Sequence, residues 1–128
     1  MKLLLDTHAL LWWLADDDQL GQPARVAIAK PTNFVFVSAA SAWEIAVKRA
    51  AGKLSAPGDI EQWIATNNFM PLPIEISDAV LSAELPPYHR DPFDRLLVAQ
   101  ARRGDMTVVT KDALFAQYGV AVLAAGEV

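Results

Sequence analysis

Four acidic residues follow predicted strands or lie in the predicted helices next to them: Asp6, Glu44, Asp94 and Asp112. Asp6 follows Leu3–Leu5, whose unbroken apolar run is typical of a strand covered on both faces of a parallel sheet. Asp112 comes shortly after another predicted strand, at residues 106–109. Ligands of parallel sheets collect at the carboxyl ends of the strands. We therefore expect these two carboxylates at the binding edge of one sheet.

Glu44 and Asp94 are expected to reach the same edge from helices. Glu44 lies within a helix predicted for residues 39–51, which follows a buried strand at 34–37. An ion pair with Lys48, one helical turn later on a solvent-facing side, would explain Glu44 equally well. Asp94 lies in the first turn of a helix that leads into the next strand. In right-handed βαβ units such a helix begins at the carboxyl edge.

Each acid at these helix starts also has a purely structural explanation. Asp6 is placed to cap the helix that follows it, and Asp91 is well placed as a cap before Pro92. Capping would also explain the turn at Asp112, with Thr110 as the cap hydroxyl. The helix dipole favours acids in a first turn, which accounts for Asp94. Taken one at a time, these residues do not distinguish a site from a set of helix caps.

The joint placement of the four acids favours a metal site. Carboxylates gathered in one small cleft repel one another and resist joint ionisation unless cations are present. With no cysteine and only two histidines in the chain, oxygen ligands select Mg²⁺ or Mn²⁺ over zinc. A metal held by carboxylates and water is a common means of activating water and holding a phosphodiester. The pattern therefore predicts metal-dependent hydrolysis of a phosphodiester.

The remaining segments alternate between helix and strand, which indicates an α/β fold with a parallel sheet. Pro71 and Pro73 exclude a central position in the sheet for the strand that contains them. Asp16–Asp18 is predicted to be a solvated loop, because its acids lack the spacing and the glycine of an EF-hand loop. Further helices are predicted at 7–15, 24–30, 60–68 and from 77, and further strands at 70–74 and 120–123.

The composition indicates one folded domain over residues 1–128. Hydrophobic residues make up 53% of the chain and charged residues 20%, which excludes wholesale disorder. A net charge of −4 is the wrong sign for binding nucleic acid through the whole surface, so such contact needs a local basic patch or bound metal. No run is suited to a signal peptide or a membrane span, and the lack of cysteine fits a cytoplasmic location.

Four motifs give the chain a resemblance to a known family: Leu5-Asp6-Thr7-His8, Ser41-Ala42-Trp43-Glu44-Ile45, His89-Arg90-Asp91-Pro92-Phe93-Asp94-Arg95 and Thr110-Lys111-Asp112. In order and spacing they resemble PIN-domain ribonucleases, specifically the VapC-type toxins of bacterial toxin–antitoxin pairs. The resemblance implies a three-layer α/β/α sandwich with a parallel, flavodoxin-like sheet, and Mg²⁺-dependent cleavage of RNA. It also implies a homodimer and a cognate antitoxin that lays a segment over the site. Either an apolar groove for that segment or the core would account for Trp12, Trp13 and Trp43.

Under this resemblance, the acidic residues of the family fall on the four acids already selected by their placement. Thr110 matches the small hydroxyl residue that supports the site, whereas Asp91 is either a metal ligand or only a helix cap. Ser41, one turn before Glu44, is either its hydrogen-bond partner or helix filler.

Several basic residues are candidates for positioning the RNA backbone. Arg90, Arg95 and Lys48 are the predicted RNA-binding residues, and Arg102 and Arg103 add charge around the same helix. Solvated surface charge is the alternative explanation for all of them.

Other functional classes fit the acids less well. A receiver-type signalling module places two adjacent acids after an early strand, but Asp6 stands alone and Val37 is followed by Ser38. An aspartyl-phosphate hydrolase begins with Asp-x-Asp, but His8 occupies the second position. A structural protein that only binds a partner stays open if the acids are caps.

Overall fold

The computed structural model describes residues 1–56 and 58–126. Strands in this part of the chain form one sheet: β1 (Lys2–Leu5), β2 (Phe34–Ser38), β3 (Met70–Leu72), β4 (Thr107–Thr110) and β5 (Val122–Ala124). All neighbouring strands run parallel, in the order β3-β2-β1-β4-β5. The predicted parallel sheet is confirmed. Its order reverses beside β1, because the chain builds outward to β3 on one side and then crosses to β4 on the other.

Two details of the sheet differ from the prediction. A flavodoxin-like sheet has its second strand at the edge, whereas here β3 occupies the edge and β2 lies inside. The edge position of β3 confirms the prediction from its proline that this strand is not central, since an edge strand leaves one side of its backbone unpaired. The last strand begins at Val122 rather than at Val120, which is instead buried in the core.

The helices are close to the predicted segments, and Asp16–Asp18 lies outside helices and strands as expected. None of the helices in the described ranges has the length and apolar character needed to cross a membrane. A 3₁₀ helix, η1, follows β4. The bounds are α1 (Thr7–Leu14), α2 (Gln22–Ala29), α3 (Ala39–Ala50), α4 (Ile60–Thr66), α5 (Ile76–Glu84), α6 (Pro92–Gly104) and η1 (Ala113–Tyr118).

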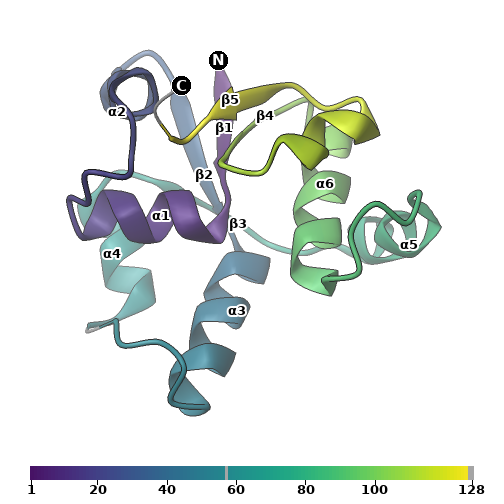
Figure 1. The fold of residues 1–128 in the computed structure, drawn as a ribbon, viewed down its shortest axis with the longest axis horizontal. Helices are drawn as coiled ribbons and strands as arrows, with labels where there is room; N and C mark the ends of the chain where they lie inside the picture. Colours follow the sequence, from purple (N-terminus) through teal and green to yellow (C-terminus); the bar gives the residue numbers. More distant parts are fainter. Residues whose placement is uncertain (57, 127–128) are drawn as a thin grey trace.

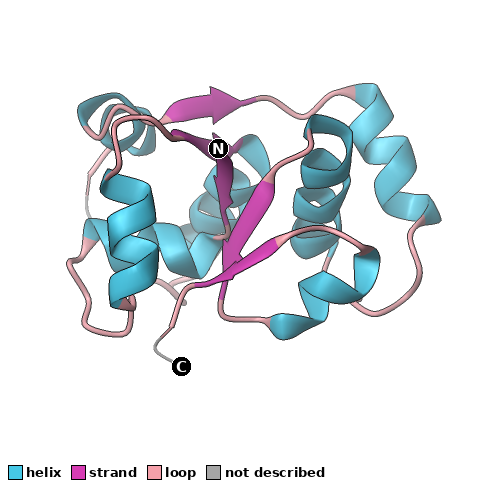
Figure 2. Ribbon diagram, turned by 90° about the horizontal axis from the view of Figure 1, so that it is seen from above, coloured by secondary structure: helices cyan, strands magenta, loops and turns pink. Residues whose placement is uncertain are grey.

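The sheet separates two apolar layers, and helices lie on both of its faces (Figures 1 and 2). Leu3 and Leu5 pack into a cluster with residues of α1, α2 and α4. Leu4 points the other way and packs with residues of α6 and η1. All three leucines are fully buried, which explains the continuous apolar run and confirms the three-layer α/β/α arrangement.

Candidate active site

A small cavity of about 160 Å³ lies beside the residues that follow β1 and β4. The four predicted acids and Asp91 all line it. They come from segments far apart in the sequence: the end of β1, the middle of α3, the start of α6 and the turn after β4. β1 and β4 are neighbours at the point where the strand order reverses, which is where open α/β sheets bind ligands. The other lining residues are Thr7, His8, Lys48, Lys111 and Phe115.

Asp6 is held in place by both its backbone and its side chain. Its backbone N–H donates to the carbonyl oxygen of Val109 at 3.0 Å, beside the pairing of β1 with β4. Its Oδ1 accepts from the backbone N–H of Ala9 at 2.8 Å and caps α1, and the Thr110 hydroxyl hydrogen-bonds to the carboxylate. The residue is 5% exposed, and burial raises its pKa against the lowering effect of these hydrogen bonds. Asp6 is therefore a helix cap and a cavity residue at once.

Glu44 is buried on α3, with 6% of its surface exposed. Thr7 Oγ1 donates to its Oε1 at 2.5 Å, and Lys48 Nζ donates to its Oε2 at 2.6 Å. The ion pair considered as an alternative explanation is present, but Glu44 faces Thr7 and the cavity rather than solvent. The hydrogen bond from Lys48 to this carboxylate raises the pKa of Lys48.

The start of α6 carries two carboxylates that influence each other. Asp91 accepts from the backbone N–H of Phe93 at 2.8 Å, as predicted for a cap, and it also lines the cavity. Asp94 is half-buried, and its pKa is raised to about 6, mainly by burial and next by the charge of Asp91. Glu44 and Asp6 raise this pKa further. The like charges of the cavity are therefore close enough to oppose one another.

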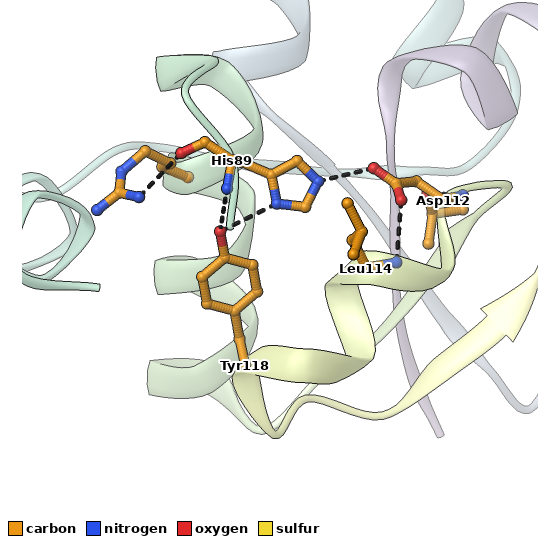
Figure 3. Close-up of polar contacts among 6 residues, drawn as sticks. His89, Asp112, Leu114 and Tyr118 are labelled. Carbon is orange, nitrogen blue, oxygen red and sulfur yellow. Dashed lines mark hydrogen bonds and ion pairs between the residues drawn. The ribbon is translucent and has the colours of Figure 1, made fainter. Parts of the chain in front are cut away.

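Asp112 lies between β4 and η1, and its carboxylate has two partners (Figure 3). Oδ1 accepts from the backbone N–H of Leu114 at 2.9 Å, and Oδ2 lies 2.7 Å from Nε2 of His89. Burial acts to raise the pKa of Asp112, but the hydrogen bonds from His89 and Leu114 lower it overall. Thr110 Oγ1 accepts from the N–H of Asp112 at 3.0 Å, so Thr110 contacts both Asp6 and Asp112.

Most of the chain matches one protein family. The family model described as the PIN domain aligns with residues 3–121. The chain belongs to the PIN domain family. A comparison with curated proteins gives no match.

Solved structures of toxin–antitoxin proteins share the fold of this PIN domain. A chain in VapBC2 from Rickettsia felis, bound to a DNA fragment from their promoter, has a TM-score of 0.67 at 13% identity, over 96% of this chain and 98% of that chain. A chain in a toxin–antitoxin complex from Klebsiella pneumoniae has a TM-score of 0.65 at 18% identity, over 98% of this chain and 99% of that chain. A chain in DNA-bound VapBC from Salmonella typhimurium has a TM-score of 0.63 at 15% identity, over 96% of this chain and 97% of that chain. At these identities the likeness shows a common fold.

The basic residues of the PIN domain lie in different surroundings. Lys48 lines the cavity, and Arg90 is exposed beside Asp91. Arg103 pairs with Asp78 at 2.7 Å in the last turn of α6, away from the cavity, so the predicted basic cluster is not gathered at the site. The guanidinium group of Arg95 donates at 2.7–3.1 Å to the backbone carbonyl oxygens of Ser82, Leu85, Pro86 and His89. These contacts assign Arg95 to holding the chain between α5 and α6.

The sequence assigned no role to Thr7 and Lys111, which line the cavity, or to His89, which contacts Asp112. Thr7 directly follows Asp6 in the first motif, and this position could have indicated a role at the site. His89 contacts Asp112, 23 residues later, and Lys111 places its Nζ 5.6 Å from the ring of Trp12. These contacts depend on tertiary packing, which a single sequence does not specify.

Ser41, predicted to support Glu44, is fully buried on α3. Its Oγ has no hydrogen-bond partner within the described residues. The oxygens of Glu44 are instead bonded by Thr7 and Lys48. The hydrogen bond considered from the sequence is therefore not formed, and a supporting role for Ser41 stays a prediction.

The chemistry of the cavity fits a hard divalent cation. Burial raises the pKa of both Asp6 and Asp94, and neighbouring carboxylates raise them further; a cation would relieve this. Among the described residues, however, no three acidic or histidine side chains are arranged as ligands of one ion. The oxygens of Glu44 bond instead to Thr7 and Lys48. Release of Oε2 of Glu44 from Lys48 would free one of its oxygens for a cation.

Proposed function

We propose that this PIN domain is a metal-dependent endoribonuclease and the toxin of a bacterial toxin–antitoxin pair. One observation carries the proposal: five carboxylates from four separate segments line one small cavity in a member of the PIN family. Fold stability alone does not favour such a cluster, because each charge opposes the ionisation of the others. Likeness in fold to VapBC and other toxin–antitoxin structures supports the assignment as a toxin.

The proposed cation is Mg²⁺, with Mn²⁺ as the alternative, since both favour carboxylate oxygens. When bound, such an ion lowers the pKa of water and stabilises charge on phosphoryl oxygens. Thr110 supports two of the proposed ligands through its hydroxyl group, and Thr7 holds a third. Asp91 is either a further ligand or only the cap of α6. The residues proposed to hold the ion are Asp6, Glu44, Asp94 and Asp112.

Lys48 and Arg90 are proposed to position the RNA backbone. The ammonium group of Lys48 lies 2.6 Å from Glu44 and lines the cavity, so it is placed to meet a phosphate beside the carboxylates. Arg90 is exposed next to the start of α6. Arg95 is left out of this role because four of its donor contacts are made to backbone carbonyl groups.

The proposed partners besides RNA are a cognate antitoxin and a second copy of this chain in a homodimer. An apolar hollow of about 660 Å³ lies between α1 and α4, lined in part by Trp12 and Trp63. It adjoins the cavity, because Lys111 lines the cavity and contacts the ring of Trp12. We propose that an antitoxin segment binds in this hollow. We further propose that residues 1–128 form one domain and act in the cytoplasm.

Cleavage of total cellular RNA by purified, antitoxin-free protein tests the proposal. The wild type and Asp94→Asn are compared with Mg²⁺ and with a chelator, and circular dichroism verifies that both are folded. Discrete fragments that require both Mg²⁺ and Asp94 are the expected result. Folded wild-type protein that leaves RNA intact would contradict the proposal and favour a binding protein whose acids only cap helices.

A further inference from the structure

His89 is buried and is bonded through its backbone and both ring nitrogens (Figure 3). Its N–H donates to the Tyr118 hydroxyl at 2.8 Å, and Nδ1 lies 3.0 Å from the same oxygen. Its carbonyl oxygen accepts from Arg95 at 3.0 Å, and Nε2 lies 2.7 Å from Oδ2 of Asp112. The ring stacks on Tyr118 and is tilted against Phe115. These contacts define both the place and the rotation of the ring.

The hydrogen bond between ring and carboxylate runs from His89 to Asp112. A carboxylate has no hydrogen to donate, so Oδ2 of Asp112 is the acceptor in the 2.7 Å contact. Nε2 therefore carries a proton in either charge state of the ring. In the neutral ring Nδ1 is the acceptor, and the hydroxyl group of Tyr118 is its donor.

One short helix supplies both residues that hold the ring. Asp112 is the cap at the start of η1, and Tyr118 is its last residue. His89 itself lies two residues before Asp91, the cap of α6. The contact therefore joins the turn after β4 to the start of α6, where Asp94 lies.

We propose that His89 is a positioning residue that, with Tyr118 behind it, fixes the carboxylate of Asp112 toward the cation site. Leu114 holds Oδ1 and His89 holds Oδ2, while 37% of the Asp112 side chain stays exposed. Each oxygen thus keeps a lone pair for the cavity. Removing such an outer partner of a ligand lowers metal affinity or activity about 10–100-fold. The inference rests on the proposed function, because it takes Asp112 as a ligand.

Binding of Mn²⁺ alone to the full-length, antitoxin-free protein, measured by isothermal titration calorimetry, tests this role without RNA. His89→Phe keeps a ring in the stack but removes the donor, and we expect Mn²⁺ affinity to fall about 10–100-fold. His89→Gln keeps an N–H donor near the position of Nε2 and should recover most of the affinity. Tyr118→Phe removes the hydroxyl behind the ring and should give an intermediate loss.

Asp94→Asn serves as the control for the site itself. Weaker Mn²⁺ binding by Asp94→Asn, with wild-type binding by His89→Phe, would overturn the positioning role and leave the proposed site standing. Wild-type binding by both variants would overturn the site as well. A purely structural His89 would lower the melting temperature of both His89 variants without changing the affinity of the folded protein. If His89→Phe does not fold, Tyr118→Phe and His89→Gln decide the question. Wild-type Mn²⁺ affinity in Tyr118→Phe would overturn the positioning role of His89. Reduced affinity in Tyr118→Phe, together with near wild-type affinity in His89→Gln, would support it.

Discussion

The two ends of α6 treat charge in opposite ways. At the last turn, Arg102 and Arg103 lie where the helix dipole favours cations, and Arg103 pairs with the buried Asp78 at 2.7 Å. At the first turn, Asp91 and Asp94 lie where the dipole favours anions, but further carboxylates surround them. Burial and these neighbours raise the pKa of Asp94 to about 6. Charge is neutralised at one end and accumulated at the other.

The partners of the acids at the two ends explain what each acid does. Asp78 is 3% exposed, and its oxygens accept from the backbone N–H of Glu75 at 2.8 Å and from Arg103. Such an acid is fully bonded and stabilises the fold. The ionised form of Asp94 is opposed by burial and by its neighbours, so its charge is kept at a cost in stability. Perturbed charges of this kind are typical of functional sites.

Removing the charge of Asp94, in the first turn of α6, should have the largest effect on activity. Asp94→Asn is expected to lower RNA cleavage by about 100-fold or more, because a catalytic metal contributes several kcal/mol. The same substitution should raise the free energy of unfolding of the cation-free protein by about 1 kcal/mol, since it removes an opposed charge that solvent partly screens. RNA cleavage and urea denaturation measure the two effects.

Asp78→Asn makes the same chemical change beside the last turn of α6, where Asp78 pairs with Arg103, and is the matched control. It weakens the partner of Arg103 and of the Glu75 N–H, so the free energy of unfolding should fall by about 1–3 kcal/mol. Cleavage per folded molecule should stay at the wild-type value. A shift of stability in the same direction for both Asp→Asn variants would show that the contrast between the two ends is wrong.

Substitution of two arginines near the start of α6 distinguishes a structural role from a role in RNA binding. Arg95→Ala loses hydrogen bonds to four backbone carbonyl groups, so the free energy of unfolding should fall by about 1–3 kcal/mol. Arg90→Ala removes an exposed side chain; stability should hold, while KM for RNA rises a few-fold and depends less on salt. Denaturation and cleavage at several salt concentrations distinguish them. Weaker RNA binding by Arg95→Ala at unchanged stability would contradict the structural role.

The pH dependence of stability should show the smallest effect. The pKa of Asp94 is about 6 in the folded protein, above the ordinary value of 3.8. Between pH 3.8 and about pH 6, Asp94 keeps a proton in the folded protein that it releases in the unfolded chain. The contribution of Asp94 to stability is therefore fully present below the unfolded pKa and is lost as the pH rises through the folded pKa. From about pH 4 to about pH 7, the cation-free wild type should lose about 1 kcal/mol relative to Asp94→Asn. A constant difference between the two proteins over this range would contradict the raised pKa.

The features that could be predicted from the sequence have local signals or follow from general topology. Leu3–Leu5 is apolar without interruption because it is covered on both faces. Asp91 and Pro92 mark the start of α6 by cap chemistry. The gathering of the acids around one cavity follows from the shared carboxyl edge of parallel strands, although each acid alone was ambiguous.

The features that could not be predicted depend on which distant segments pack together. The proline in β3 predicted that this strand is not central, but the position of β2 inside the sheet is set by strand order, which an apolar pattern does not encode. Arg95 was predicted to bind RNA because its charge is visible in the sequence, but the carbonyl groups that surround it are not. The contact of His89 with Asp112 exists only because the chain before α6 lies against η1.

Anomalous diffraction from crystals of the full chain grown with Mn²⁺ tests the proposed cation site most directly. We predict an anomalous peak in the cavity, within coordination distance of oxygens from Asp6, Glu44, Asp94 and Asp112. Oε2 of Glu44 is then expected to have turned from Lys48 toward the ion, while Asp112 keeps its hydrogen bond to His89. A peak elsewhere, or none at saturating Mn²⁺, would contradict the assignment of these acids as metal ligands.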